Sequence, residues 1–367
     1  MSSKVYFWNL RTSMKYPYEK RIKRLLKRSG VFTGVAAGDL VAVKIHFGEA
    51  GTTAFISPLR VAPIIAFLIK TGARPFLADT NTLYTGQRYQ GVSHSLTAAR
   101  HGFDPNILGA PVVIADGIRS GHEREVVIQG RHFDLCSIAG DIADADALVS
   151  VNHFKGHCLA GFGGALKNLA MGCATVKGKM QQHCGMGPNI DEARCTGCGA
   201  CVDACRYGAL SLEEEKAAID RDRCTGCGAC MHECAFKALV VDWKVNTPVF
   251  LERLVEYASG AIAPHRKTAH ITFITGVTPG CDCEGHSDAA ICPDIGVMAS
   301  TDPVAIDQAA LDMVNQAPAL YPSALPKALG PGEDKFKALH PEIDGTHALA
   351  YAEQLGLGSR RYELIDI

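Results

Sequence analysis

Eight of the fifteen cysteines lie in two copies of one short stretch. The sequence Arg-Cys-Thr-Gly-Cys-Gly-Ala-Cys spans residues 194–201 and recurs letter for letter at residues 223–230. Each copy is followed, after three more residues, by a fourth cysteine, which is Cys205 in the first copy and Cys234 in the second. A Cys-x-x-Cys-x-x-Cys run places three thiolates around one face of a [4Fe–4S] cube, and small intervening residues let backbone N–H groups reach the sulfurs. The spacing therefore predicts two such clusters.

The fourth cysteine of each copy is expected to bind the cluster of the other copy, because it sits on a following helical turn and reaches the neighbouring cube. We assign one cluster to Cys195, Cys198, Cys201 and Cys234, and the other to Cys224, Cys227, Cys230 and Cys205. The segment resembles the two-cluster ferredoxin module of bacteria. Zinc is a weaker alternative, since zinc sites prefer paired Cys-x-x-Cys units from separate segments. Disulfides are the other alternative for these cysteines; they are typical of secreted domains, and nothing in this sequence indicates secretion.

The whole chain has the size of a globular protein with two or three domains. Its 367 residues include 37 basic and 38 acidic side chains, so the net charge of −1 attracts neither nucleic acid nor a membrane surface. The longest apolar run covers residues 61–69, which is too short to span a bilayer. The first residues lack the basic-then-apolar pattern of a secretion signal, so we expect a cytoplasmic protein.

Apolar runs alternate with amphipathic ones along the chain. Strands are expected at residues 4–8, 40–45, 75–78, 111–115 and 147–151, with helices at 18–28, 57–70 and 92–100 and a hairpin at 125–135. Later elements are a helix at 248–259, strands at 270–276 and 294–300, and a helix that Asp302 caps and Pro303 opens. This alternation predicts an α/β fold with a mostly parallel sheet. The ferredoxin-like segment splits that domain, which gives an N-terminal part at 1–185, the two-cluster module at 186–243 and a C-terminal part at 244–367.

Polar residues gather just after the ends of five expected strands. In α/β folds, ligands bind at that edge of the sheet. These residues are His46 and Glu49; Asp79, Thr80, Asn81, Thr82 and Tyr84; Asp116; Asn152, His153, Lys155, His157 and Cys158; and Thr278, Cys281, Asp282, Cys283 and Glu284. A single residue of this kind is usually a cap or a hydrogen-bond partner. The set as a whole predicts a ligand pocket.

Four of these side chains are candidates for catalysis. His153, Lys155 and His157 are suited to move protons or to hold an anionic group. Lys167 belongs to a glycine-rich stretch at 161–168, which is either a helix start whose free N–H groups hold the anion or a packing turn. The further residues expected in the same pocket are Lys177, Lys179 and His183.

Cys281 and Cys283 are candidate ligands of an additional metal ion. Thiols two residues apart do not easily bond to each other, but both can ligate one metal. The residues that could complete the site are His153, His157 and Cys158. The alternative is a pair of free thiols in a loop. Cys136 and Cys173 have apolar neighbours and are expected in the core.

Five segments carry a resemblance to a known family. They are Val-Lys-Ile-His-Phe-Gly-Glu at 43–49, Asp-Thr-Asn-Thr-Leu-Tyr at 79–84, Asn-His-Phe-Lys-Gly-His at 152–157 with Lys-Asn at 167–168, Pro-Gly-Cys-Asp-Cys at 279–283, and Asp-Pro-Val-Ala-Ile-Asp at 302–307. The chain resembles proteins with domain of unknown function 362, in the branch with an inserted ferredoxin module known as Fe–S centre proteins. The resemblance implies two [4Fe–4S] clusters and a redox setting, but no particular reaction.

Three functions are consistent with these patterns. The first is an iron–sulfur oxidoreductase, whose two clusters pass electrons to a substrate or second cofactor in the α/β domain. The second is a non-enzymatic electron carrier that docks to a larger redox complex, and the third is a protein that handles a metal or cluster. The expected partners are thus a redox protein or a small molecule. We expect one cavity, facing a cluster, to contain His153, Lys155, His157, Lys167, Cys281 and Cys283.

Overall fold

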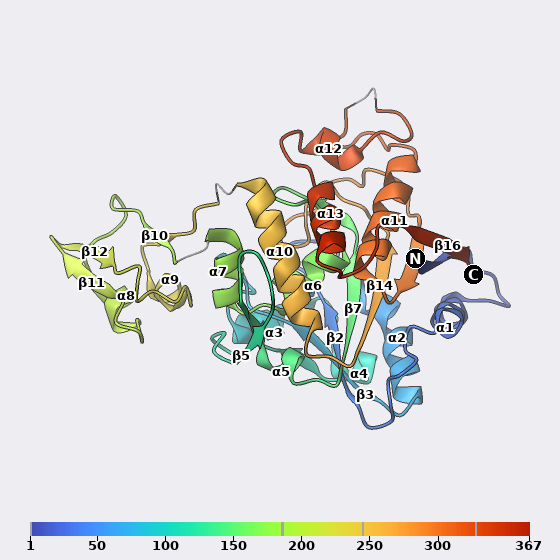
Figure 1. Ribbon diagram of the computed structural model, residues 1–367, viewed down its shortest axis with the longest axis horizontal. Coiled ribbons are helices and arrows are strands. Elements are labelled where there is room, and N and C mark those ends of the chain that lie inside the picture. Colours follow the sequence, from blue (N-terminus) through green and yellow to red (C-terminus); the bar gives the residue numbers. More distant parts are fainter. Residues whose placement is uncertain (1, 185–186, 244–245, 327–328) are drawn as a thin grey trace.

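The computed structural model describes residues 2–184, 187–243, 246–326 and 329–367. Within these ranges an eight-stranded sheet lies at the centre, with helices on both faces (Figure 1). Its strands follow the order β16 (Tyr362–Asp366), β1 (Ser3–Trp8), β15 (Gly296–Ser300), β14 (Lys267–Ile274), β7 (Ala147–His153), β2 (Leu40–Ile45), β3 (Arg74–Asp79) and β4 (Val112–Ile114). β15 pairs antiparallel with both neighbours, and the other pairings in this sheet are parallel. The prediction of an α/β fold with a mostly parallel sheet is confirmed.

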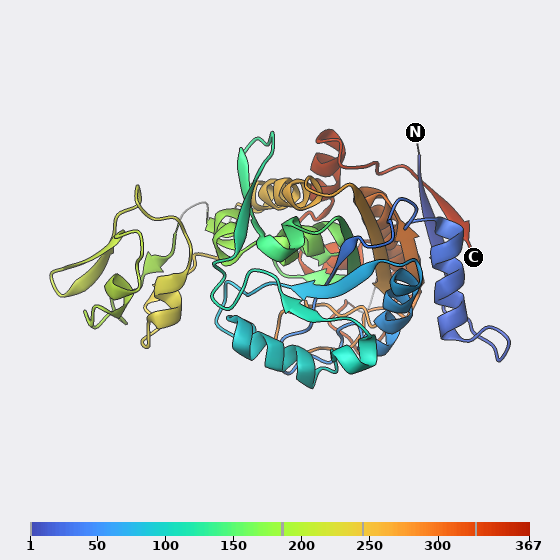
Figure 2. The same cartoon turned by 90° about the horizontal axis from the view of Figure 1, so that it is seen from below.

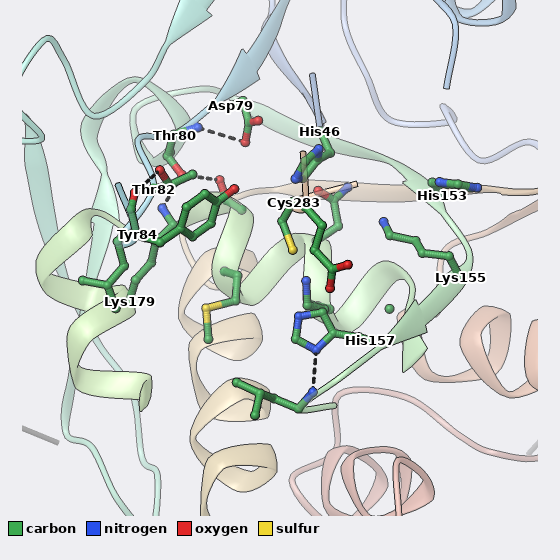
Figure 3. Close-up of a pocket in the computed structure, with 18 of the residues that line it drawn as sticks. His46, Asp79, Thr80, Thr82, Tyr84, His153, Lys155, His157, Lys179 and Cys283 are labelled. Carbon is green, nitrogen blue, oxygen red and sulfur yellow. Dashed lines mark hydrogen bonds between the residues drawn. The ribbon is translucent and has the colours of Figure 1, made fainter. Parts of the chain in front are cut away.

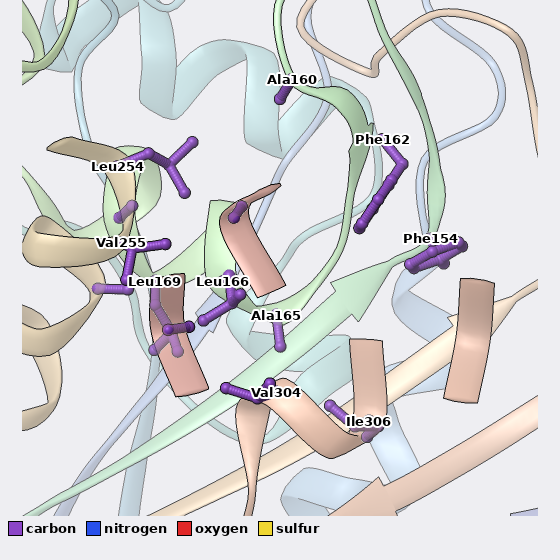
Figure 4. Packing of buried hydrophobic residues seen from close by; sticks show 14 of the residues in the cluster. Phe154, Ala160, Phe162, Ala165, Leu166, Leu169, Leu254, Val255, Val304 and Ile306 are labelled. Atoms are coloured by element: carbon purple, nitrogen blue, oxygen red, sulfur yellow. The ribbon is translucent and has the colours of Figure 1, made fainter. Parts of the chain in front are cut away.

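Two groups of helices cover the two faces of the sheet (Figure 2). One face carries α1 (Tyr18–Ser29), α2 (Pro58–Lys70), α3 (Gly91–Arg100) and α4 (Pro105–Leu108), and the other carries α6 (Ala165–Cys173), α10 (Thr247–Ile262), α11 (Pro303–Gln316) and α13 (Thr346–Gln354). In Figure 4, Leu166 and Leu169 of α6 lie in the same cluster as Val255 of α10 and Val304 of α11. Strands covered on both faces read as continuous apolar runs. No helix in the described part of the chain is both long enough and apolar enough to cross a membrane.

The expected elements are present, and they differ from the prediction at the hairpin and where pairing partners are distant in sequence. The hairpin is wider than expected, with β5 at Glu123–Val127 and β6 at Leu135–Ala139, and the short helix α5 (Gly140–Ala143) follows it. β15 runs antiparallel because the loop from β14 contains no crossover helix. The C-terminal stretch, which has no recognisable pattern, forms α12 (Lys335–Leu339), α13 and β16. β16 extends the sheet beside β1, where Tyr362 pairs with Ser3.

Residues 187–243 form a small unit that projects from one end of the α/β domain (Figures 1 and 2). Its helices, α8 (Ala200–Asp203) and α9 (Ala229–Glu233), begin after Gly199 and Gly228, whose φ values of 79° and 74° favour glycine. Its strands pair as β10 (Asn189–Ile190) with β13 (Leu239–Val240), and β11 (Leu210–Glu213) with β12 (Lys216–Ile219). The sequence duplication is therefore repeated in the backbone. The domain boundaries expected at residues 185–186 and 244 lie outside the described residues.

Candidate functional site

A cavity of about 430 Å³ lies at the carboxyl ends of β2, β3 and β7 (Figure 3). The chain runs from β2 outward to β3 and β4, and then returns to β7 on the other side of β2. Ligands of open α/β sheets bind at such a reversal of the strand order. Of the six residues expected to share one cavity, five line it: His153, Lys155, His157, Lys167 and Cys283. The other residues predicted after strand ends that line it are His46, Asp79, Thr80, Thr82, Tyr84, Cys158 and Glu284. Cys281 is buried next to them, with its Sγ 3.4 Å from Lys167 Nζ.

A backbone contact at Gly156 brings the two predicted loops together. After β7, the chain forms the hairpin of β8 (Lys155–His157) and β9 (Gly161–Gly163), and β8 lies against the loop that follows β14. The Gly156 N–H donates to the Thr278 carbonyl at 2.9 Å, and a Cβ at this position would lie 2.0 Å from the Pro279 carbonyl oxygen. Because residue 156 has no side chain, Lys155 and His157 can lie beside Cys281 and Cys283.

His153 is held by two acceptors. Its Nδ1 lies 2.9 Å from Asp282 Oδ1, and its Nε2 lies 2.8 Å from the Thr275 carbonyl oxygen. Because both partners accept, both ring nitrogens carry a proton. Burial alone would raise the pKa of Asp282, but the charges of His153 and Lys155 lower it well below its usual range. His153 therefore anchors the Asp282 loop and has no free ring nitrogen for a ligand.

Lys167 and Cys283 both hydrogen-bond to Cys281. The Lys167 ammonium lies 3.4 Å from Cys281 Sγ, and the backbone N–H of Cys283 donates to the same sulfur at 3.4 Å. A hydrogen bond from the Cys283 side chain and the charge of Lys167 hold the pKa of Cys281 well below its ordinary value, although burial opposes them. The neighbouring Cys281 and burial raise the pKa of Cys283. Within the pair, a negative charge is therefore favoured on Cys281 over Cys283.

His157 is oriented as a proton donor. Its Nδ1 accepts hydrogen bonds from the backbone N–H groups of Leu159 and Ala160, each at 3.1 Å. Burial, together with the charge of Lys167, lowers its pKa well below the usual value, so the ring is neutral and carries its proton on Nε2. One His157 nitrogen and the sulfurs of Cys281 and Cys283 lie within 4.8 Å of one another. A metal ligand needs a free nitrogen lone pair, so the hydrogen bonds at Nδ1 disfavour this histidine as a ligand.

The glycine-rich stretch is a packing turn whose N–H groups are occupied by a carboxyl group of the protein itself. The carboxyl oxygens of Asp307 accept from the backbone N–H groups of Ala165 at 2.7 Å and Leu166 at 2.9 Å, at the start of α6. A Cβ on Gly164 would lie 2.2 Å from this carboxyl group. Of the two alternatives for this stretch, the structure therefore has the packing turn. Lys167, one turn on, still points toward the cavity.

Of the three residues expected further along the chain, two line the cavity. Lys179 and His183 of α7 (Val176–Cys184) are both among the lining residues. Lys177 is not; its Nζ pairs with Glu123 and Glu125, each at 3.2 Å. Cys158 lines the cavity as an exposed side chain. Cys136 and Cys173 are fully buried in the core, as predicted.

A buried ion-pair network in the wall of the cavity was not foreseen from the sequence. Asp79 lies 3.0 Å from Lys44 Nζ and 3.1 Å from Arg88 Nη1, and His94 Nε2 lies 3.5 Å away. Burial would raise the pKa of Asp79, but the charge of Lys44 and the nearby His94 lower it well below its usual range. The sequence could have indicated a buried ion pair at Lys44, since a lysine inside the apolar strand β2 is rarely buried without a partner.

Residues 41–312 match the model of a family described as Domain of unknown function (DUF362). The chain belongs to the DUF362 family. No curated protein matches the chain with significance.

Two solved structures are similar to the DUF362 protein. One is the lactate racemase apoprotein from Thermoanaerobacterium thermosaccharolyticum, with 14% identity and a TM-score of 0.40 over 74% of this chain and 51% of that one. The other is a protein from Thermotoga maritima, with 10% identity and a TM-score of 0.40 over 72% of this chain and 52% of that one. The chain spans about half the length of these two structures.

In the DUF362 protein, the eight cysteines of the duplicated stretch surround two small voids. One void is lined by Cys195, Cys198, Cys201 and Cys234, and the other by Cys205, Cys224, Cys227 and Cys230. The backbone N–H of Ala209 donates to Cys205 Sγ at 3.3 Å, and that of Ala238 donates to Cys234 Sγ at 3.3 Å. The two groups of four are those that the spacing predicts.

The two copies differ in their surroundings. Gly226 and Gly228 of the second copy are buried, and Cβ atoms there would lie 3.2 Å from Met180 and 2.8 Å from Val176 of α7. The equivalent glycines of the first copy are partly exposed. The second copy therefore packs against the α/β domain of the DUF362 protein, and the first faces outward.

Proposed function

We propose that this protein is an iron–sulfur oxidoreductase. Residues 187–243 would hold two [4Fe–4S] clusters, and the cavity of the α/β domain would bind the substrate or second cofactor with which electrons are exchanged. The observation that carries the proposal is the pair of four-cysteine voids, each with backbone N–H donors aimed at sulfur. Four thiolates with such hydrogen bonds are the donor set that a cubic cluster requires. When bound, the clusters would supply single electrons.

The position of α7 favours electron exchange with the cavity. Val176 and Met180 contact the second cysteine run, while Lys179 and His183 of the same helix line the cavity. One helix, about 10 Å across with its side chains, therefore separates the two sites. The contact between the units also includes an ion pair from Arg119 to Glu233 at 2.9 Å. These contacts support the enzyme over a carrier unit that moves freely, although the exposed first run remains suited to a redox partner protein.

Side chains of the cavity would bind the anionic group, donate a proton and position these residues. Lys155 and Lys167 provide positive charge for an anionic group of the bound molecule. His157 offers the proton on its Nε2. His153 positions Lys155 and the Cys281 loop through Asp282, whose carboxylate oxygens lie 2.9 Å from His153 and 3.3 Å from Lys155.

Iron analysis of anaerobically purified protein tests the proposal. Two cubic clusters require about eight irons and about eight sulfides per chain. A count near four irons, or zinc in place of iron, would refute it. The Cys136→Ser variant is the matched control, because that cysteine is buried in the α/β core and should leave the iron count unchanged.

A metal-handling role is a second candidate, because the Cys281 and Cys283 sulfurs lie close together beside the cavity. This function predicts a further metal equivalent beyond eight irons, which a Cys281→Ser, Cys283→Ser double variant would lose. An unchanged metal content in that variant would exclude it.

A further inference from the structure

We propose that the cavity binds an aromatic carboxylic acid, with the carboxylate between Lys155 and Lys167 and the ring against Trp243 and Phe250. The inference deepens the proposed function by naming the chemical class of the molecule bound in the α/β domain.

The two lysines form a cationic end with free donors. Among the described residues, Lys155 Nζ has one ion-pair partner, Asp282 at 3.3 Å, and Lys167 Nζ has one hydrogen-bond partner, the Cys281 sulfur at 3.4 Å. Each ammonium has three N–H groups, and buried donors are nearly always satisfied. Both side chains pass the same glycine, since a Cβ on Gly163 would lie 3.2 Å from Lys167 Cδ and 3.7 Å from Lys155 Cε. Their unused N–H groups can therefore meet on one oxyanion.

The charges at this end fit a monoanion. The carboxylate of Asp282 faces two cations, His153 and Lys155, so one positive charge has no anionic partner there. The carboxylate of Glu284 also lines the cavity, with its side chain 33% exposed. A carboxylate would balance this positive charge, whereas a phosphate dianion would add a second negative charge near Glu284. The neutral His157 adds one more donor, its Nε2–H.

Part of the cavity wall is apolar and aromatic. His183 stacks on Phe250, with ring centroids 4.8 Å apart and planes 24° apart, and Trp243 meets His183 edge-on at 4.8 Å. Leu83 and Met171 complete this wall. Figure 3 has His153 and Lys155 on one side of the cavity and Lys179, Thr82 and Tyr84 on the other. A flat ring gains most from such a wall.

The size of the cavity agrees with this ligand. At about 430 Å³ it lies in the range of small-molecule sites, which are mostly apolar with a few polar groups that fix orientation. A two-ring acid fits within this volume.

Calorimetric titration of the anaerobic, cluster-loaded protein with 2-naphthoate tests the inference. The acid should bind saturably, and the uncharged 2-naphthamide about tenfold or more weaker, because it loses charge-assisted hydrogen bonds. Lys155→Met and Lys167→Met should each weaken naphthoate binding by a similar factor. Lys177→Met is the matched control, since that lysine pairs with Glu123 and Glu125 outside the cavity, and it should leave binding unchanged.

Three outcomes would overturn the inference. The first is equal binding of acid and amide, the second is no saturable binding of either, and the third is displacement of naphthoate by inorganic phosphate at equal concentration. Because iron content is measured separately, a protein with eight irons that fails to bind naphthoate refutes the ligand class alone. A protein without iron that binds naphthoate refutes the redox function alone.

Discussion

The carboxyl group at the start of α6 should make the stability of the fold depend on pH. Asp307 is 1% exposed, and burial raises its pKa from 3.8 to about 7, although two backbone N–H groups donate to it. Between these two pH values the unfolded chain has lost this proton, while the folded protein still holds it. The contribution of Asp307 to stability is therefore fully present below about pH 3.8 and is lost as pH rises through about 7.

The size of the effect follows from the two pKa values. At 1.36 kcal/mol for each pKa unit, the difference between 3.8 and about 7 corresponds to about 4 kcal/mol. The Asp307→Asn variant cannot ionise, so its stability lacks this dependence. Its amide oxygen can accept from one of the two N–H groups, and the lost bond should cost about 1–2 kcal/mol at every pH.

Denaturant titrations of wild type and Asp307→Asn at several pH values between 4.5 and 8 measure the effect. The difference in free energy of unfolding should shift in favour of the variant as pH rises to 7 and should stay constant above it. Other titrating groups cancel in this difference. A difference that does not change over this range would show that Asp307 is ionised throughout and that its hydrogen bonds outweigh burial.

Three further predictions concern buried contacts and the cysteines. Asp79→Asn should lower the free energy of unfolding by about 3–5 kcal/mol in a denaturant titration, because Lys44 and Arg88 lose their buried counter-charge. Gly156→Ala should destabilise by about 1–3 kcal/mol in a similar titration, because the new methyl group clashes with the Pro279 carbonyl. Gly121→Ala, where a Cβ meets open space, is its control. Cys205→Ser should damage the cluster of the second run rather than that of its own run; electron paramagnetic resonance showing loss of the first cluster would reverse the ligand pairing.

An element of the fold was predictable where the residues that form it also mark its start or end in the sequence. Asp302 and Pro303 mark the start of α11, and the Asp302 carboxylate accepts from the N–H groups of Val304 and Ala305 at 2.8 Å. The direction of β15 and the existence of β16 were not predictable in this way. Their conformation depends on pairing with strands far along the chain, as in the contact between Ser3 and Tyr362.

In the candidate site too, features marked by local sequence were predictable, and features that depend on distant segments were not. Strand ends marked the residues that meet in the cavity, because parallel strands bring their carboxyl ends to one edge. Their hydrogen-bond partners were hidden, and these partners decide what each residue can do. Asp307 occupies the backbone N–H group of Ala165 from 142 positions away. His153 is committed to Asp282 and to the carbonyl of Thr275, which local sequence could not reveal.

The duplicated stretch provides two equivalent cysteines whose reactivity can be compared to measure how residues 187–243 associate with the α/β domain. Cys198 and Cys227 have identical neighbours in sequence, yet the first is exposed and the second is partly buried on the side that meets α7. Thiol reactivity depends on access and on the local environment. In iron-free protein, the ratio of their alkylation rates would therefore report the fraction of time that the second copy is separated from α7. Because Cys198 and Cys227 have the same flanking residues, their intrinsic reactivities cancel in the ratio of the two rates. Mass spectrometry could therefore follow the separation of the second copy from α7 without a label attached at the contact.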